Sequence, residues 1–182
     1  SMKPKIYIDG KEGTTGLQIY DRLGDRDDIE LLLIDGDKRK DVAERAKLLN
    51  AADLVFLCLP DAAAVEAVSL IENGSTRVID CSTAHRTADG WVYGFPELHG
   101  QRERIKTAKR VANPGCYATG FLSLVRPLVE TGALPQDAYV ACHALSGYTG
   151  AGKKAIAQYS DPGRDVELDS PRHYAVALAH KH

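Results

Sequence analysis

The chain has 182 residues, of which 44% are hydrophobic and 26% are charged, proportions that are typical of a globular protein. Its net charge of −2 leaves no excess of basic residues to attract nucleic acid or an anionic membrane surface. No apolar stretch approaches the roughly 18 residues that span a bilayer, and the N-terminus lacks the pattern of a signal peptide. We therefore expect a cytoplasmic protein with no nucleic acid and no membrane among its partners.

The first segment predicts a turn that binds a dinucleotide. An apolar strand at 5–9 is followed by three glycines, and then by apolar residues at helical spacing. In this context the first glycine permits a tight turn, the second lets a pyrophosphate approach, and the third lets the helix pack closely. The spacing Gly-x-x-Gly-x-x-Gly differs from the usual Gly-x-Gly-x-x-Gly, so a plain turn is the alternative. The expected cofactor-binding residues are Gly10, Gly13, Thr14, Thr15 and Gly16.

The second predicted strand, at 29–34, ends in a segment that selects the nicotinamide cofactor. Asp35 suits the ribose 2′-hydroxyl of NAD, because an acid at this position usually accepts its hydrogen bond. Lys38, Arg39 and Lys40 suit the 2′-phosphate of NADP instead. The residues alone leave both cofactors open, and a solvated helix start is the alternative role for the basic run.

Helices at 42–50 and 62–71 alternate with strands at 53–59 and 77–80, with short connections between them. This order predicts an α/β fold with a doubly wound parallel sheet, in which ligands bind at the carboxyl ends of the strands. Pro60 and Ser82 follow two of these ends, so we expect both to line the cofactor crevice. The segment 91–98 is expected to be a crossing loop.

A short strand at 109–112 leads to Cys116, the candidate nucleophile. Asn113 suits a helix cap and Pro114 a first helical position, so Cys116 is expected in the first turn. The dipole of the helix should lower the thiol pKa from its usual ~8.5. The alternative is a small buried residue. Cys58 and Cys142 lie in apolar runs and are expected to be core residues of strands.

The remaining chain predicts a second region. A sheet should begin at 139–145, and the glycine-rich loop 146–154 offers amides and lysines to an anion. The loop nearly matches a nucleotide-binding P-loop, but Lys154 replaces the Ser or Thr that would hold magnesium. A surface loop at 160–171 precedes an alternating pattern at 172–182, which predicts a strand carrying His180 and His182.

Four motifs together resemble one enzyme family. They are Gly-Lys-Glu-Gly-Thr-Thr-Gly at 10–16, Asp-Cys-Ser-Thr-Ala-His-Arg at 80–86, Asn-Pro-Gly-Cys-Tyr-Ala-Thr at 113–119 and Ser-Gly-Tyr-Thr-Gly-Ala-Gly-Lys at 146–153. In this order they are similar to the N-acetyl-gamma-glutamyl-phosphate reductases of the wider semialdehyde dehydrogenase group. Gly-Cys-Tyr, in place of the Asn-Cys of aspartate-semialdehyde dehydrogenases, favours the acetylglutamyl members.

The resemblance implies a Rossmann-type NADP-binding domain at 2–115 and part of an α+β catalytic and dimerisation domain at 116–182, with a chain that continues beyond it. The implied activity is the NADPH-dependent reduction of N-acetyl-L-glutamyl 5-phosphate to the 5-semialdehyde, a step of arginine biosynthesis, by a homo-oligomer that is a dimer or a tetramer. An aspartate-semialdehyde dehydrogenase-like enzyme and a non-catalytic dinucleotide-binding protein are the alternatives.

The resemblance also assigns roles to individual residues. Cys116 would form a thioester with the acyl group, and His182 would be the acid/base, with His180 as the alternative for that role. No metal is implied. The implied substrate-binding residues, with Arg86 on the phosphate of the acyl phosphate, are Arg86, Asn113, Ser146, Gly147, Lys153 and His180.

Overall fold

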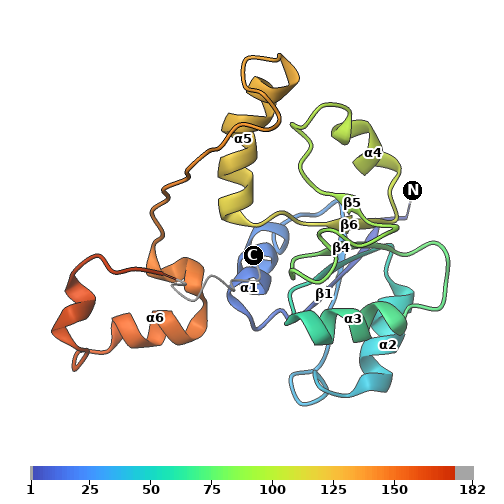
Figure 1. The fold of residues 1–182 in the computed structure, drawn as a ribbon. Coiled ribbons are helices and arrows are strands. Elements are labelled where there is room, and N and C mark those ends of the chain that lie inside the picture. The colour runs from blue at the N-terminus through green and yellow to red at the C-terminus, as the bar shows by residue number, and fades with distance from the viewer. Residues whose placement is uncertain (1, 175–182) are drawn as a thin grey trace. The chain divides into compact units, whose positions relative to one another are not determined.

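The computed structural model describes residues 2–174, and in them a parallel sheet carries helices on both faces (Figure 1). The six strands of the sheet lie in the order β2-β1-β3-β4-β6-β5. The predicted doubly wound α/β fold is therefore confirmed. The strands are β1 (Lys5–Asp9), β2 (Glu30–Leu32), β3 (Leu54–Leu57), β4 (Arg77–Asp80), β5 (Val92–Tyr93) and β6 (Arg110–Ala112).

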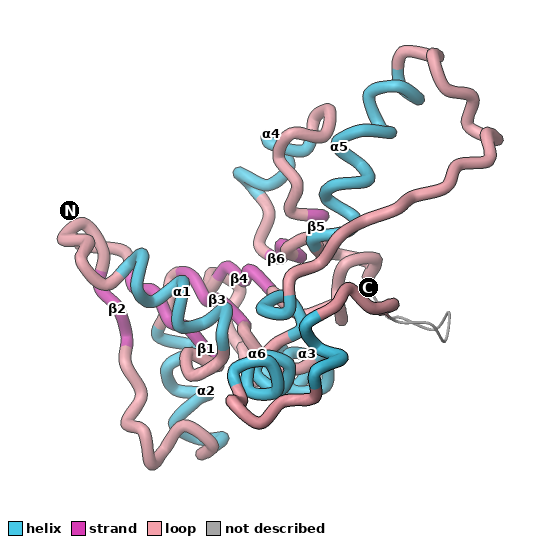
Figure 2. The backbone as a smooth tube through the Cα atoms, turned by 90° about the vertical axis from the view of Figure 1, so that its left-hand side faces the viewer, coloured by secondary structure: helices cyan, strands magenta, loops and turns pink. Residues whose placement is uncertain are grey.

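The winding of the chain reverses at β1. The connection from β1 to β2 contains α1 (Thr14–Leu23), and the chain then returns past β1 through α2 (Val42–Ala51) to β3. Because such crossovers are right-handed, α1 covers one face of the sheet, while α2 and α3 (Asp61–Ser69) cover the other (Figure 2). The reversal leaves a crevice between the carboxyl ends of β1 and β3, where ligands bind in folds of this class.

The hydrophobic core lies between the sheet and the helices α2 and α3. Val55 and Leu57 of β3 are fully buried there against Leu49 of α2. Ala64 and Ala67 are the buried residues of α3, and their small side chains let this helix lie close to the strands. The core thus holds the strand ends in register, with Asp9 beside Leu57 and Leu57 beside Asp80.

The edge of the sheet differs from the expectation at 91–98. This segment is not only a crossing loop, since Val92 and Tyr93 form β5 and pair in parallel with β6. Gly94 permits the pairing, because a Cβ at this position would lie 2.9 Å from the carbonyl oxygen of Ala112. The helix α4 (Gln101–Thr107), which had not been predicted, then connects β5 to β6.

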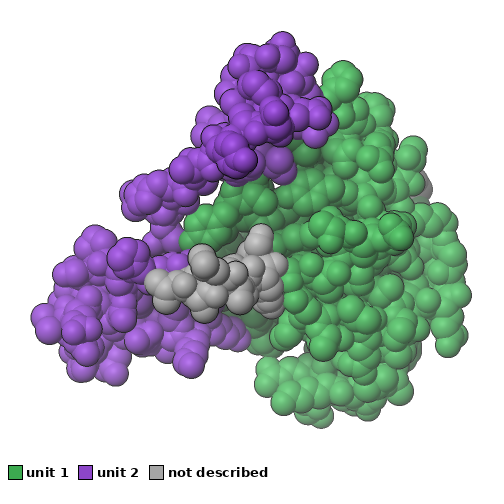
Figure 3. Space-filling model, viewed as in Figure 1, with its two compact units in different colours: residues 1–119 green, residues 120–182 purple. Residues whose placement is uncertain are grey.

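The chain forms two compact units, residues 1–119 and 120–182 (Figure 3). The helix α5 (Cys116–Glu130) begins in the first unit and ends in the second. The described part of the second unit adds the 3-10 helices η1 (Tyr148–Ala151) and η2 (Val166–Asp169), with α6 (Lys153–Ser160) between them. None of the helices within residues 2–174 combines the length and apolar character that crossing a bilayer requires.

The prediction of a strand at 139–145 is wrong, since this segment has no regular secondary structure. Tyr139 and Leu145 are almost fully exposed, and Cys142, expected in the core, is exposed as well. A strand needs a neighbour to accept its backbone hydrogen bonds, and no strand of residues 120–174 is there to pair with it. The strand predicted at 172–182 lies outside the described residues from 175 onward.

Candidate active site

The glycine turn after β1 has the geometry that a cofactor turn requires. Gly10 has a positive φ of +83°, and a Cβ there would lie 2.3 Å from the carbonyl oxygen of Cys58. At Gly16 a Cβ would lie 2.4 Å from the carbonyl oxygen of Gly10. Gly13 stands at the N-cap of α1, and Thr14 and Thr15 are the first two helical residues. The amides of this first turn have no acceptor within the helix, so they can bind an anion.

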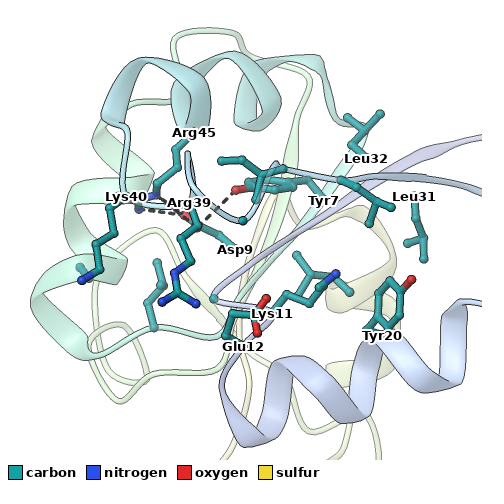
Figure 4. Close-up of a pocket in the computed structure, with 17 residues that line it drawn as sticks. Tyr7, Asp9, Lys11, Glu12, Tyr20, Leu31, Leu32, Arg39, Lys40 and Arg45 are labelled. Atoms are coloured by element: carbon teal, nitrogen blue, oxygen red, sulfur yellow. Dashed lines mark hydrogen bonds and ion pairs between the residues drawn. The ribbon is translucent and has the colours of Figure 1, made fainter.

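A cavity of about 280 Å³ opens beside this turn (Figure 4). Leu31 to Ile34 and Leu59 give it an apolar wall that can hold an aromatic base. Its charged lining residues are four bases and two acids, so the cavity has an excess of positive charge. These residues are Lys11, Arg39, Lys40 and Arg45, with Asp9 and Glu12.

The basic segment contributes unequally to this cavity. Arg39 and Lys40 both line it, and in Figure 4 the Arg39 side chain extends into it. Lys38 is not among the lining residues; its ammonium lies 3.9 Å from the carboxylate of Asp35, on the exposed surface. Asp35 does not line the cavity either. The acid that would select NAD is therefore not among the residues that line the cavity beside the glycine turn.

A buried ion pair lies among the residues that line the cavity. Arg45 of α2 donates from Nε and Nη2 to the Asp9 carboxylate, with the shortest distance 2.8 Å, and both side chains are less than a tenth exposed. The Tyr7 hydroxyl also donates to Asp9, and burial, followed by the charge of Asp9, raises the pKa of Tyr7. The pair was not predicted. The sequence did contain one indication of it: an acidic residue at the end of a buried strand requires a basic or hydrogen-bonding partner.

Cys116 is exposed and is the first residue of α5. The helix begins two residues later than predicted, because the backbone of Asn113 is engaged at the end of the sheet. The Asn113 amide donates to the carbonyl of Asp80 at 2.8 Å, and the Asn113 carbonyl accepts from Arg86 Nε at 3.0 Å. Asn113 and Pro114 therefore lead into the helix from outside it. An exposed thiol at a helix start is open to an acyl substrate.

Arg86 lies directly beside the Cys116 segment. A Cβ on Gly115 would lie 2.8 Å from Nη1 and 3.3 Å from Cζ of Arg86, so the absence of a side chain there makes room for the guanidinium. Among residues 2–174 the buried Nη1 of Arg86 has no hydrogen-bond partner. A buried, unpaired donor of this kind has a strong affinity for an anion, and the planar guanidinium suits a phosphate.

Both parts of the chain match families of known proteins. Residues 5–108 match the family described as semialdehyde dehydrogenase, NAD binding domain, and residues 116–182 match semialdehyde dehydrogenase, dimerisation domain. The first match alone covers more than half of the chain. The chain belongs to the semialdehyde dehydrogenase family.

Its curated relatives in this family include proteins named N-acetyl-gamma-glutamyl-phosphate reductase. The protein of Trichormus variabilis is 55% identical over 99% of this chain, and that of Chelativorans sp. is 54% identical over all of it. In each case the match covers 58% of the relative. The chain thus spans somewhat under three fifths of the length of the curated relatives it matches.

Solved structures support the same fold. Aspartate semialdehyde dehydrogenase II of Vibrio cholerae, complexed with ASA, is similar with a TM-score of 0.61 and 14% identity, over 88% of this chain and 51% of that one. Aspartate semialdehyde dehydrogenase of Francisella tularensis gives a TM-score of 0.59 and 18% identity, over 92% and 53% respectively.

In this family member the loop after β4 is held by a buried carboxylate. Asp80 accepts from the amide and the hydroxyl of Ser82, at 2.9 and 2.8 Å, and lies 2.5 Å from Nδ1 of His85. The His85 ring also stacks on Trp91, with the ring centroids 3.9 Å apart. These contacts show His85 as a packed residue, and Ser82, expected at the cofactor, has its hydroxyl engaged by Asp80.

Apart from Pro60, the other expected site residues lie in the second unit or outside the described residues. Ser146 and Gly147 precede η1, and Lys153 is the first residue of α6, which follows Gly152 with its φ of +88°. The predicted glycine-rich loop thus contains a helical turn and leads into a helix. His180 and His182 lie outside the described residues, so their roles stay predictions. Pro60, in the first unit, stands at the N-cap of α3.

Proposed function

We propose that the protein catalyses the NADPH-dependent reduction of N-acetyl-L-glutamyl 5-phosphate to N-acetyl-L-glutamate 5-semialdehyde, with release of phosphate. The observation that carries this proposal is the exposed Cys116 next to the buried, unpaired Nη1 of Arg86. A thiol beside an anion-binding guanidinium suits a substrate whose reactive carbon carries a phosphate. The choice of substrate is supported by relatives of that name at 52% to 55% identity.

The residues of the first unit fit a dinucleotide. The Gly10 and Gly16 positions form a turn in which any Cβ would collide with backbone, which favours the close approach of a pyrophosphate to the amides of Thr14 and Thr15. Arg39 and Lys40 would hold a 2′-phosphate in the positively charged cavity. Because Asp35 does not line that cavity, NADP is the proposed cofactor.

The chemistry divides into two steps. In the first, the Cys116 thiolate attacks the acyl carbon, the C–O bond to phosphate breaks, and phosphate leaves toward Arg86. When bound, NADPH supplies a hydride that reduces the resulting thioester carbon. Release of the aldehyde then restores the Cys116 thiolate and requires a group that moves a proton. His182 is proposed for that role, with His180 as the alternative.

Two further features belong to the proposal. The first is that five residues are proposed to contact the substrate: Asn113, Ser146, Gly147, Lys153 and His180. The carbonyl of Asn113 also orients Arg86. The match of residues 116–182 to a dimerisation domain supports a homo-oligomer.

The reverse reaction tests the substrate. With NADP and phosphate, N-acetylglutamate semialdehyde should support NADPH formation, while aspartate semialdehyde should give little or none. A preference for aspartate semialdehyde would replace the proposal with the activity named for the structural neighbours. A protein that binds NADPH but oxidises neither semialdehyde, and whose Cys116 reacts no faster with iodoacetamide than Cys142, would be a non-catalytic dinucleotide-binding protein.

Gly115→Ala should raise the KM for phosphate in the reverse reaction about tenfold or more. The new methyl group would lie 2.8 Å from Arg86 Nη1 and displace a guanidinium whose charged hydrogen bonds to phosphate contribute roughly 1.5–3 kcal/mol. The matched control is Gly120→Ala in the helix α5 that follows, because a Cβ at Gly120 meets nothing within 4 Å beyond its chain neighbours and the nearby backbone of its own helix. Steady-state kinetics at varied phosphate decides the matter, and equal KM values for the two variants would remove Arg86 from the phosphate site.

Arg39→Glu should raise the Kd for NADPH at least about tenfold and leave the Kd for NADH nearly unchanged, because only NADPH carries the 2′-phosphate. Lys38→Glu makes the same charge change one residue earlier, outside the lining of the cavity, and should have a much smaller effect. Fluorescence titration of both cofactors, with the parent and the two variants, measures the six Kd values. A larger effect of Lys38→Glu would assign the 2′-phosphate to Lys38 instead.

A further inference from the structure

Two half-buried cysteines lie side by side beyond the ends of β3 and β4. The strands pair in parallel with Leu57 beside Asp80, and the next residues along the two chains are Cys58 and Cys81. The pairing continues past the strands, since the Cys81 amide donates to the Leu57 carbonyl at 2.9 Å. Residues in register on adjacent strands lie about 4.8 Å apart, within the 4.4–6.8 Å that a disulfide spans between its Cα atoms.

The two neighbouring thiols differ in acidity. The interaction with Cys58 lowers the pKa of Cys81, and the charge of Arg86 adds to this, although burial and the charge of Asp80 act in the opposite direction. The same interaction, followed by burial, raises the pKa of Cys58. The lowered pKa favours Cys81 as the attacking sulfur of the pair, with Cys58 as the resolving thiol beside it.

The pair lies against the cofactor turn. The Cys58 carbonyl packs on Gly10 so closely that a Cβ on Gly10 would be 2.3 Å from it. Pro60 and Ser82, which the sequence predicts to line the cofactor crevice, follow within two residues of the cysteines. The commonest Cα separation in a disulfide is about 5.5–6 Å, so a covalent bond between Cys58 and Cys81 would widen the spacing of about 4.8 Å and shift the backbone on which the glycine turn rests.

We propose that Cys58 and Cys81 form a reversible disulfide that weakens dinucleotide binding when the protein meets a hydroperoxide. In the first step the Cys81 thiolate attacks a peroxide oxygen, the O–O bond breaks, and the hydroxide released takes up a proton to become water. The Cys58 sulfur then attacks the Cys81 sulfenic acid, the S–S bond forms, and the hydroxyl leaves as water with the Cys58 proton. Two thiols lose two electrons and two protons, and one hydrogen peroxide becomes two waters.

Peptide mapping after hydrogen peroxide treatment tests the bond itself. Trypsin cleaves after Arg77, so Cys58 and Cys81 fall in separate peptides, 48–77 and 78–86. We expect these peptides to become linked on oxidation and to separate again in dithiothreitol. Oxidation of Cys116 or Cys142 while peptides 48–77 and 78–86 remain unlinked would overturn the proposal.

NADPH titration tests the consequence, which rests on the proposed cofactor site. The Kd of the oxidised protein should rise at least about fivefold and recover in dithiothreitol. Cys81→Ser and Cys58→Ser should abolish the change, whereas Cys142→Ser, with an exposed thiol in the other unit, should behave like the parent. If either variant fails to fold, the dithiothreitol reversal in the parent remains decisive. Linked peptides with an unchanged Kd for NADPH would refute the effect of the disulfide on dinucleotide binding. A reduced protein without affinity for NADPH would instead refute the proposed cofactor. In that case the peptide map would still test whether the disulfide forms.

Discussion

Cys116→Ala is expected to reduce turnover of N-acetylglutamate semialdehyde on the order of 10³-fold or more and to leave the Kd for NADPH unchanged. The substitution removes the sulfur that bonds to the acyl carbon, and loss of a covalent nucleophile removes the whole pathway that depends on it. The glycine turn that would hold the cofactor is built from residues 10–16 and needs no atom of Cys116. The measurement is the rate of NADPH formation beside a fluorescence titration.

Cys142→Ala provides the control, because Cys142 is also a free and exposed cysteine but has no place at the start of a helix. Its activity should equal that of the parent, and Cys116 should be alkylated by iodoacetamide much faster than Cys142. Activity of Cys116→Ala above a few per cent of the parent would show that the sulfur does not carry the reaction.

Asp9→Ala should lower the free energy of unfolding by about 3–5 kcal/mol, because it leaves the Arg45 guanidinium buried without a counter-charge. Both side chains of this pair are less than a tenth exposed, and Arg45 makes its side-chain hydrogen bonds to Asp9. The substitution also removes the acceptor of the Tyr7 hydroxyl. Urea unfolding, followed by circular dichroism, measures the change.

The matched substitution is Asp28→Ala, which breaks an ion pair of similar length between Asp28 and Arg26. That pair is more than half exposed, so water replaces the lost partner and the expected change is below about 1 kcal/mol. Equal losses for the two variants would show that the Asp9–Arg45 pair contributes no more than a surface contact.

The amino-acid sequence by itself determined the parallel sheet and the cofactor turn. Helices predicted at 42–50 and 62–71 appear at Val42–Ala51 and Asp61–Ser69, because apolar periodicity and strand spacing are local properties that survive folding. The spacing of the three glycines likewise predicted a tight turn, in which Gly10 and Gly16 lie in close contact with backbone atoms. Cys116 was placed at a helix start from its neighbours alone, with an error of two residues.

Tertiary structure alone decided which side chains meet. Asp9 and Arg45 are 36 positions apart, and Cys58 and Cys81 become neighbours only because β3 and β4 pair in one register. The fold also places Arg39 in the lining of the cavity and Lys38 beside Asp35 on the surface. Two adjacent basic residues in a sequence give no indication of which one will line a cavity. At 139–145 a strand-like sequence stayed irregular, because pairing depends on a neighbouring strand and not on the segment itself. Local pattern sets what a segment can become, and the contacts between distant segments set what it does.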